Sequence, residues 1–366
     1  MEFWKVGIIP MRAQILTMGH VRLITRAKLT CSKLVIVLGS HNEASSVRNP
    51  FSAYERENLI REFIDQDSGL KQEDISFRYL EDCTDNDVWV KRFSELLSSI
   101  AATHNALKHS QMSMFGSDKD NDVEARKKWT SIHCTHIEPL SVHGDVLSAT
   151  NIRDIVYGKF SVARKCEIFR RLHIGGKIPK CTQVFLTNYV GVGGEHHLRL
   201  CVEAQAIKEH INKYSRGKIT HTGDALCVRW AEELYKGQLV RVPELLLIRR
   251  GGQFGNGLLA IAGGFMDDGE TFRQSADREL FEELSVDSSC KPVISTVNFS
   301  AVGRDPRGRV ITQAFRFDFK ESDLDENVEA RSDAKSFEWV PYYQLDKKEM
   351  FLDHYDIINE LMKEAL

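Results

Sequence analysis

Apolar and polar positions along the first 150 residues follow two alternating periods. Short apolar runs predict strands, and the stretches between them have the spacing of amphipathic helices, beginning near residue 19 and covering 52–64 and 88–100. The predicted strands lie at residues 5–9, 33–38, 75–79, 112–115 and 132–137. Because strands alternate with helices, the pattern predicts a doubly wound α/β domain, whose parallel sheet binds ligands at the carboxyl ends of its strands.

The pattern changes after residue 160. Helical, polar spacing extends to residue 214, and the short polar segment 215–218 marks a boundary. Beyond it, helices are expected at 271–284 and 355–366, and strands at 225–230, 244–248, 257–262, 293–297, 310–319 and 336–340. This order predicts an α+β second domain. A chain of 366 residues is long for one core, so we expect an N-terminal domain, a helical linker and a C-terminal domain at 1–190, 191–217 and 218–366.

Composition excludes several classes of protein. The chain is 42% hydrophobic and 28% charged, with a net charge of −3, so it has no general electrostatic attraction to nucleic acid or to membranes. It has no apolar run of about 18 residues, and its first residues are not a secretory signal. Eight cysteines without a CxxC pair favour reduced thiols and a cytoplasmic location. Self-association into a homo-oligomer is left open.

Three glutamates share one face of the predicted helix at 271–284. Glu279, Glu282 and Glu283 stand at i, i+3 and i+4, which brings their carboxylates together. Carboxylates that close repel each other, and a bound Mg²⁺ or Mn²⁺ would remove the repulsion. Gly264 lets the backbone approach such an ion, so we expect these four residues to form the metal site. The alternative is an acidic, solvated helix face.

The spacing around these glutamates is more specific than the glutamates alone. Gly264, Glu270 and Arg278 precede them at fixed intervals, and the full segment resembles the motif of the Nudix hydrolases. The resemblance implies metal-dependent hydrolysis of a nucleoside diphosphate, with Glu283 as a catalytic residue. Ser285 stands where the family usually has glycine. This position closes the helix, where left-handed geometry favours glycine, so the departure concerns stability more than chemistry.

Two further segments bear on the substrate of this half. Residues 304–309, followed by 312–315, resemble a segment of Nudix enzymes that act on ADP-ribose or related nucleotide sugars. That resemblance implies substrate-binding roles for Arg304 and Arg307. The alternative is a basic β-hairpin turn, because Asp-Pro and Arg-Gly are turn dipeptides. Residues 351–354 resemble the same subgroup, and the sequence assigns them no role.

A short polar segment follows the first predicted strand. Thr17, Gly19 and His20 lie where a loop leads into a helix. Gly19 permits close approach of a phosphate to the free N–H groups of the helix N-terminus. His20 can donate a hydrogen bond to an α-phosphate as charge develops during in-line attack. The alternative is an ordinary loop histidine.

A second polar segment stands near residue 150. Ser148 and Thr150 are residues of the N-cap type before an apolar turn. Arg153 lies one turn further on and can clamp the β- and γ-phosphates of a nucleotide. Taken alone, this segment also describes a capped helix without a function.

Together and in this order, the two segments resemble the (H/T)xGH and SxTxxR signatures of HIGH-type nucleotidyltransferases. Residues 49–56, 86–89 and 119–120 also recur in nicotinamide-nucleotide adenylyltransferases. The resemblance implies that the indole of Trp89 stacks on the nicotinamide ring, a cation–π contact, and it implies substrate contacts for Lys119 and Asp120. The alternative for Trp89 is a core position on an amphipathic helix.

The whole chain resembles the bifunctional nicotinamide-nucleotide adenylyltransferase/Nudix hydrolases of bacteria and some of their phages. In the first signature Arg12 and Gln14 match the family pattern and are implied to bind substrate, as are Thr17, Gly19, Ser148 and Thr150. Met11, Ala13 and Ile15 depart from that pattern. The resemblance implies synthesis of NAD from nicotinamide mononucleotide (NMN) and ATP with Mg²⁺, and hydrolysis of ADP-ribose to AMP and ribose 5-phosphate.

Two alternatives remain open from the sequence. A nucleotide sensor would bind ADP-ribose or NAD without turnover and would have a weak or inactive N-terminal domain. The intact set of glutamates argues against this for the C-terminal half, because a sensor does not need metal ligands. A Nudix enzyme for another nucleoside diphosphate, such as NADH, would keep the chemistry and change the substrate.

Overall fold

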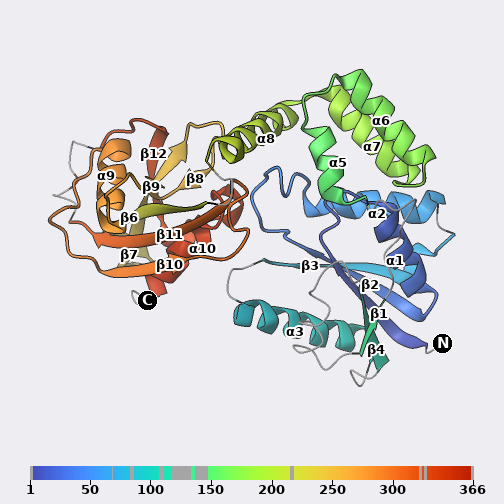
Figure 1. Cartoon of the computed structure of the whole chain (residues 1–366). Helices are drawn as coiled ribbons and strands as arrows, with labels where there is room; N and C mark the ends of the chain where they lie inside the picture. The colour runs from blue at the N-terminus through green and yellow to red at the C-terminus, as the bar shows by residue number, and fades with distance from the viewer. Residues whose placement is uncertain are drawn as a thin grey trace. The chain divides into compact units, whose positions relative to one another are not determined.

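The chain folds into two compact units, Met1–Cys201 and Val202–Leu366 (Figure 1). The computed structural model describes residues 3–67, 69–82, 86–106, 111–116, 133–136, 147–214, 218–320, 324 and 328–363. The boundary between the units falls inside helix α8, Glu195–Tyr214, which lies in the segment expected to be a helical linker.

The first unit is built on a five-stranded parallel sheet of order β3-β2-β1-β4-β5. This topology confirms the predicted doubly wound α/β domain. The strands are β1 (Trp4–Met11), β2 (Cys31–Gly39), β3 (Ile75–Leu80), β4 (Met112–Gly116) and β5 (His133–His136). All five lie at or within a few residues of the positions that the apolar runs predict.

Helices cover both faces of this sheet. Helices α1 (Met18–Lys28) and α2 (Ala53–Asp67) pack through residues such as Ile24 and Ile60 against one side of the strands. Helix α3 (Asn86–Thr103) packs through Phe93 and Leu97 against the other side. A strand buried on both faces reads as a continuous apolar run, which is why residues 34–38 carry no polar position.

A helical layer completes the first unit. It comprises α5 (Ala149–Val156), α6 (Val162–Ile174), α7 (Lys180–Val192) and the first part of α8. Helix α7 packs against both α6 and α2, and Cys181 of α7 joins the core below α1 and α2. This layer holds the loops after β1 and β2, because Thr182 of α7 donates to the Leu16 carbonyl over 2.9 Å and Arg199 of α8 donates to the Ser45 carbonyl over 3.1 Å.

The second unit is a mixed sheet of order β10-β11-β6-β7-β12, with β8 paired to β7 and β9 paired to β6. Among the strand pairs described in this unit, only β11 and β6 run parallel. The unit is the predicted α+β domain. Its elements are β6 (Ile219–Tyr235), β7 (Gln238–Arg250), β8 (Leu259–Ala260), β9 (Ala262–Phe265), α9 (Phe272–Leu284), β10 (Ser295–Phe299), β11 (Arg309–Asp318), β12 (Ala334–Pro341) and α10 (His354–Met362).

The longest strands of this unit exceed their predicted lengths. Strands β6 and β7 continue into a hairpin closed by Lys236 and Gly237, whose φ angles are 50° and 83°. Two positive φ angles are typical of the tight turns that join twisted strands. The sequence does not predict this extension, because it contains charged residues such as Glu232 and Lys236, which are exposed and interrupt any apolar run.

Two general expectations can be checked in the part of the chain that the structure describes. No helix there is long and apolar enough to cross a membrane. Six cysteines there are free thiols, namely Cys31, Cys166, Cys181, Cys201, Cys227 and Cys290.

Helix α9 ends as its sequence predicts. Ser285 is the C-terminal cap and has a left-handed backbone, with φ 57° and ψ 23°. Its hydroxyl is buried, and no residue in the described ranges forms a hydrogen bond with it. A side chain costs free energy in this conformation, and a buried hydroxyl without a partner adds to that cost.

Replacing Ser285 with glycine should therefore stabilise the second unit. We expect Ser285→Gly to raise the free energy of unfolding by about 0.5–1 kcal/mol, which is roughly 1–4 °C in melting temperature for a domain of this size. Calorimetry of the full chain measures the change. The matched control is Ser289→Gly, because Ser289 is exposed and its φ is not positive. A Ser285→Gly variant no more stable than the control would contradict the strain argument.

Candidate functional sites

The first candidate site begins at the N-terminus of α1. The backbone N–H of Thr17 donates to Nδ1 of His20 over 3.1 Å, and the Thr17 hydroxyl lies 3.0 Å from the same nitrogen. Since Nδ1 accepts, the proton of a neutral His20 ring is on Nε2. A Cβ on Gly19 would lie 3.5 Å from Thr17 Oγ1, an ordinary contact, so the protein's own packing does not require glycine there.

Three arginines, Arg12, Arg48 and Arg153, lie near one another in this unit. The pKa of Arg153 is lowered first by loss of hydration and further by the positive charges of Arg12 and Arg48. The pKa of Arg48 is lowered in the same way, first by loss of hydration and then by Arg12. Three guanidinium groups that repel one another suit a polyanion such as a triphosphate.

Arg48 is a site residue that sequence reasoning missed. It lies in the loop that joins β2 to α2, and no motif marks it. The one available signal was its position, because loops at the carboxyl ends of parallel strands line the ligand site of this fold.

The second polar segment caps α5 and orients its arginine. Ser148 is the N-cap, and its hydroxyl accepts from the Asn151 backbone N–H over 3.2 Å. The Arg153 guanidinium donates to Thr150 Oγ1 over 3.0 Å. The two hydroxyls thus support Arg153, and their contacts with substrate stay a prediction.

Gln14 has a packing role in the same loop. It is buried, and its side-chain oxygen accepts from the backbone N–H of Phe51 over 3.1 Å. Its amide nitrogen donates to Asn49 over 3.4 Å. Gln14 therefore joins the loop after β1 to the loop that carries Arg48, and its predicted contact with substrate is untested.

The sequence left two roles open for Trp89, a core position and stacking on a nicotinamide ring. Its ring stacks on Phe93 at 5.1 Å and 28°, and it packs against the core under α3 while staying partly exposed. This packing supports a core contribution. Stacking on a nicotinamide ring stays a prediction. Lys119 and Asp120 lie outside the described residues.

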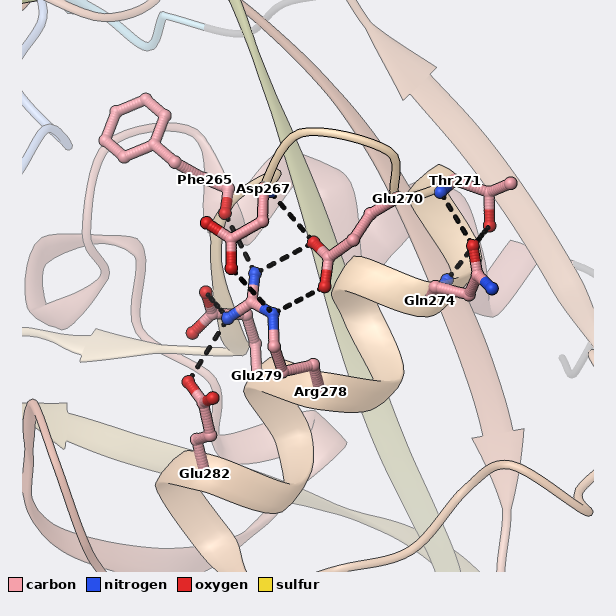
Figure 2. Close-up of polar contacts among 8 residues, drawn as sticks. All are labelled: Phe265, Asp267, Glu270, Thr271, Gln274, Arg278, Glu279 and Glu282. Carbon is pink, nitrogen blue, oxygen red and sulfur yellow. Dashed lines mark hydrogen bonds and ion pairs between the residues drawn. The ribbon is translucent and has the colours of Figure 1, made fainter.

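The second candidate site is organised by Arg278 of α9 (Figure 2). Its guanidinium donates to both oxygens of Glu270, over 2.7 and 3.1 Å, and to the Phe265 carbonyl over 3.0 Å. It also donates to Glu279 over 2.7 Å and to Glu282 over 3.2 Å. The hydrogen bond to Glu270 is the main reason that the pKa of Arg278 is raised, and it lowers the pKa of Glu270.

Glu283 lies deeper than the other glutamates. Its carboxylate accepts the backbone N–H of Gly263 over 3.1 Å, and its side chain is buried. Burial, the largest cause, and the charge of Glu279 together raise the pKa of Glu283 to about 8. At the next residue, Gly264, a Cβ would collide with the Glu279 carboxylate. The two glutamates therefore meet β9 at adjacent glycines, which explains the glycine requirement.

The three glutamates are not arranged as a preformed metal site. Within the described ranges, no group of three or more His, Cys, Asp or Glu side chains is placed to hold a metal ion. Arg278 binds Glu279 and Glu282, a pairing that the sequence analysis did not assign, and the metal site expected at Gly264, Glu279, Glu282 and Glu283 stays a prediction. The oxygen donors around Gly264 nevertheless fit a hard divalent cation, because Glu279 and Glu283 lie against the same glycine pair.

The residues predicted to bind substrate form ion pairs. Arg304 donates two hydrogen bonds to Asp353, each of 2.7 Å, and the two side chains are only 6% and 9% exposed. Arg307 pairs with Asp305 at 2.7 Å. The segment 351–354 thus gains a role that the sequence did not assign, since Asp353 holds Arg304.

A stack of rings lies beside this site and was missed from the sequence. The Phe265 ring lies 5.2 Å from His210 of α8, nearly parallel to it, and 5.0 Å from the Arg307 guanidinium. The same guanidinium lies 4.7 Å from the ring of Phe254. The signal was weak, because these residues are separated by up to 97 positions and belong to no common motif.

Comparisons with known proteins divide the chain in the same way. Residues 236–361 match the NUDIX domain, and residues 12–155 match the cytidylyltransferase-like domain. The ADP-ribose pyrophosphatase of Methanocaldococcus jannaschii is 33% identical over 127 residues, which cover 35% of this chain and 70% of that protein. The chain belongs to the Nudix family.

Other relatives resemble the first unit or the whole chain. The nicotinamide-nucleotide adenylyltransferase of Saccharolobus solfataricus is 32% identical over 83 residues, 23% of this chain and about half (48%) of that protein. A bifunctional NMN adenylyltransferase/ADP-ribose pyrophosphatase from Francisella tularensis has a TM-score of 0.79 at 21% identity, with both chains fully covered. Its complex with AMP and a manganese ion has a TM-score of 0.77 at 22% identity, with equal coverage. At these identities the two structures establish a shared fold.

One histidine of this half should make stability depend on pH. His354 is buried, its Nδ1 accepts the Ile261 backbone N–H over 3.2 Å, and burial holds its pKa well below the ordinary value of 6.5. The nearby charges of Arg250, Arg304 and Arg307 lower that pKa further. Below pH 6.5 the His354 imidazole binds a proton in the unfolded chain but not in the folded chain. This difference lowers the stability of the folded state as pH falls.

Relative to a His354→Asn variant, we expect the free energy of unfolding of the wild type to fall from pH 6.5 downwards, by up to ~1.4 kcal/mol per pH unit from this proton. His354→Asn keeps an acceptor for the Ile261 N–H but cannot titrate, so its pH profile should lose that slope. Denaturant unfolding at several pH values between 7.5 and 5 compares the two proteins. Parallel profiles would show that His354 is not responsible.

Proposed function

We propose that this chain is a bifunctional enzyme of nicotinamide-nucleotide metabolism. The first unit would join NMN to the adenylyl group of ATP, giving NAD and pyrophosphate, and the second would hydrolyse ADP-ribose to AMP and ribose 5-phosphate. The observation that carries the proposal is the placement of opposite charges: Arg12 and Arg48 lie close enough to Arg153 to lower its pKa, and Glu283 and Glu279 lie against Gly263 and Gly264. The activities named for the relatives support both assignments.

In the first unit, adenylyl transfer needs positioning and charge stabilisation more than covalent chemistry. An oxygen of the NMN phosphate bonds to the α-phosphorus of ATP, and the bond to the bridging oxygen of pyrophosphate breaks. His20, held through Nδ1 by Thr17, would donate from Nε2 to an α-phosphate oxygen as negative charge develops there. Arg48 and Arg153 would hold the departing pyrophosphate.

In the second unit, the oxygen donors suit Mg²⁺ or Mn²⁺. Glu279, Glu282, Glu283 and the backbone oxygen of Gly264 would hold the ion. When bound, such an ion polarises a phosphoryl group and lowers the pKa of water. The protein's own contribution is positional: Arg278 fixes Glu270 and Glu279, and the Gly263 N–H fixes Glu283.

The ring stack supports a nucleotide as the substrate of the second unit. Phe265 directly follows Gly264, and Arg307 lies over its ring at 5.0 Å and over that of Phe254 at 4.7 Å. Flat aromatic and guanidinium surfaces bind the planar base of a nucleotide well. We therefore assign Arg307 to the substrate site and Arg304, buried with Asp353, to the support of that site.

The Nudix assignment is tested at Glu283. Glu283→Gln keeps the size of the side chain and removes its charge, so it should fold normally and hydrolyse ADP-ribose at least ~10²-fold more slowly. Glu360→Gln, on the exposed side of α10, is the matched control and should have full activity. Product analysis of AMP and ribose 5-phosphate measures the rate. A folded variant with normal hydrolysis would exclude the role of Glu283. A wild type that binds ADP-ribose without hydrolysing it would favour the sensor.

The adenylyltransferase assignment is tested at His20. If His20 acts mainly in the transition state, His20→Ala should lower kcat for NAD synthesis by roughly 10²–10³-fold and change KM for ATP much less. Hydrolysis of ADP-ribose by the same preparation serves as the internal control and should not change. An unchanged kcat with a raised KM would instead mean that His20 only binds substrate.

A further inference from the structure

A chain of hydrogen bonds in the first unit joins the two elements that carry phosphate-site arginines. Tyr157 directly follows α5, the helix of Arg153, and its hydroxyl lies 3.3 Å from that of Tyr189 on α7. The Tyr189 hydroxyl lies 3.1 Å from Nδ1 of His196, at the start of α8. The other ring nitrogen of His196 lies 2.6 Å from Ser45 Oγ.

Ser45 lies in the loop between β2 and α2, three residues before Arg48. The turn that carries Arg48 follows at once, and it is closed by hydrogen bonds of 3.3 and 3.2 Å between Ser46 and Asn49. Arg199 of α8 donates to the carbonyl oxygen of Ser45 over 3.1 Å and to its hydroxyl over 3.2 Å. Helix α8 therefore holds this loop directly before the turn.

The two ends of the same loop have separate anchors. Near its start, the side chain of Asn42 accepts the Asp82 backbone N–H over 3.0 Å. Near its end, the Phe51 N–H donates to Gln14 over 3.1 Å. Ser45 holds the segment between these anchors, so the contact with α8 is not a duplicate of either.

Each hydrogen bond in this series can have one donor and one acceptor. Burial raises the pKa of Tyr157 and raises that of Tyr189 to about 12, so both phenols stay protonated at neutral pH. The pKa of His196 is lowered, first by loss of hydration and then by Arg199, which keeps its ring neutral. With the ring proton on Nε2, Tyr157 donates to Tyr189, Tyr189 to His196, and His196 to Ser45.

We propose that the Tyr157–Tyr189–His196–Ser45 chain positions Arg48 relative to Arg153 and so sets the affinity of the first unit for the polyphosphate of a nucleoside triphosphate. The four are positioning residues, because they act through the arginines and not on the substrate. The inference rests on the adenylyltransferase function proposed above.

Tyr189 is the best position for a test because its ring and its hydroxyl have separate contacts. The ring lies 5.1 Å from Phe51 and 6.3 Å from Phe185. Tyr189→Phe keeps these contacts and removes only the central link. The matched control is Tyr54→Phe on α2, since Tyr54 is 71% exposed. Loss of one hydrogen bond predicts a rise of roughly threefold to tenfold in KM for ATP.

The full chain is assayed for NAD synthesis with both substrates varied. We expect Tyr189→Phe to raise KM for ATP and to leave kcat and KM for NMN within about twofold. Ser45→Ala should have the same effect, and Ser45→Thr, which retains the hydroxyl, should restore the wild-type value. Equal losses for both substrates, or a normal KM for ATP in both Tyr189→Phe and Ser45→Ala, would overturn the proposal.

A double-mutant cycle with Arg48→Ala shows whether the chain acts through that arginine. In the Arg48→Ala background, Tyr189→Phe should have little further effect on KM for ATP, because the positioned group is gone. Strictly additive effects would overturn the proposal. If the wild type makes NAD and the Tyr189→Phe and Ser45→Ala variants have the same KM for ATP, this inference is refuted and the proposed function stands. A wild type that makes no NAD refutes the proposed function, and the inference with it.

Discussion

Repulsion between like charges is the physical constraint on which both candidate sites depend. In the first unit Arg12 and Arg48 lower the pKa of Arg153, and in the second Glu279 raises the pKa of Glu283. Like charges held together in this way cost free energy, so the surrounding structure has to keep them in place. A polyphosphate in one site, or a divalent cation in the other, supplies the missing counter-charge, so the cost of assembly becomes a source of affinity.

The two units support their charges differently. In the second unit a single guanidinium, Arg278, spans Glu270, Glu279, Glu282 and the Phe265 carbonyl, so one rigid fork arranges several carboxylates (Figure 2). In the first unit the cations are on different elements, and neutral hydrogen bonds hold those elements together. Helix α8, which lies in the segment expected to be a linker, contributes a residue to each unit. His196 contacts the loop of Arg48 in the first unit, and His210 stacks on Phe265 in the second.

Much of this protein follows from its sequence alone. The parallel sheet was predictable because strands buried on both faces must be apolar throughout, and the left-handed cap at Ser285 because helix ends have strict backbone geometry. The Nudix site was predictable because its residues lie within one glycine-to-helix segment, where spacing determines geometry. The same holds for Thr17 and His20, which meet across one helical turn.

Tertiary structure alone decided what pairs with those residues. The partnership of Arg304 with Asp353, 49 positions apart, places a residue that the sequence predicts to bind substrate in a buried ion pair. Arg48 joins Arg12 and Arg153, and His210 joins Phe265, only because separate loops and helices meet in space. Periodicity and local spacing report which face of an element is apolar and how a short segment bends. They carry no information on which distant side chains share a low-dielectric environment, and those partners determine charge, orientation and burial.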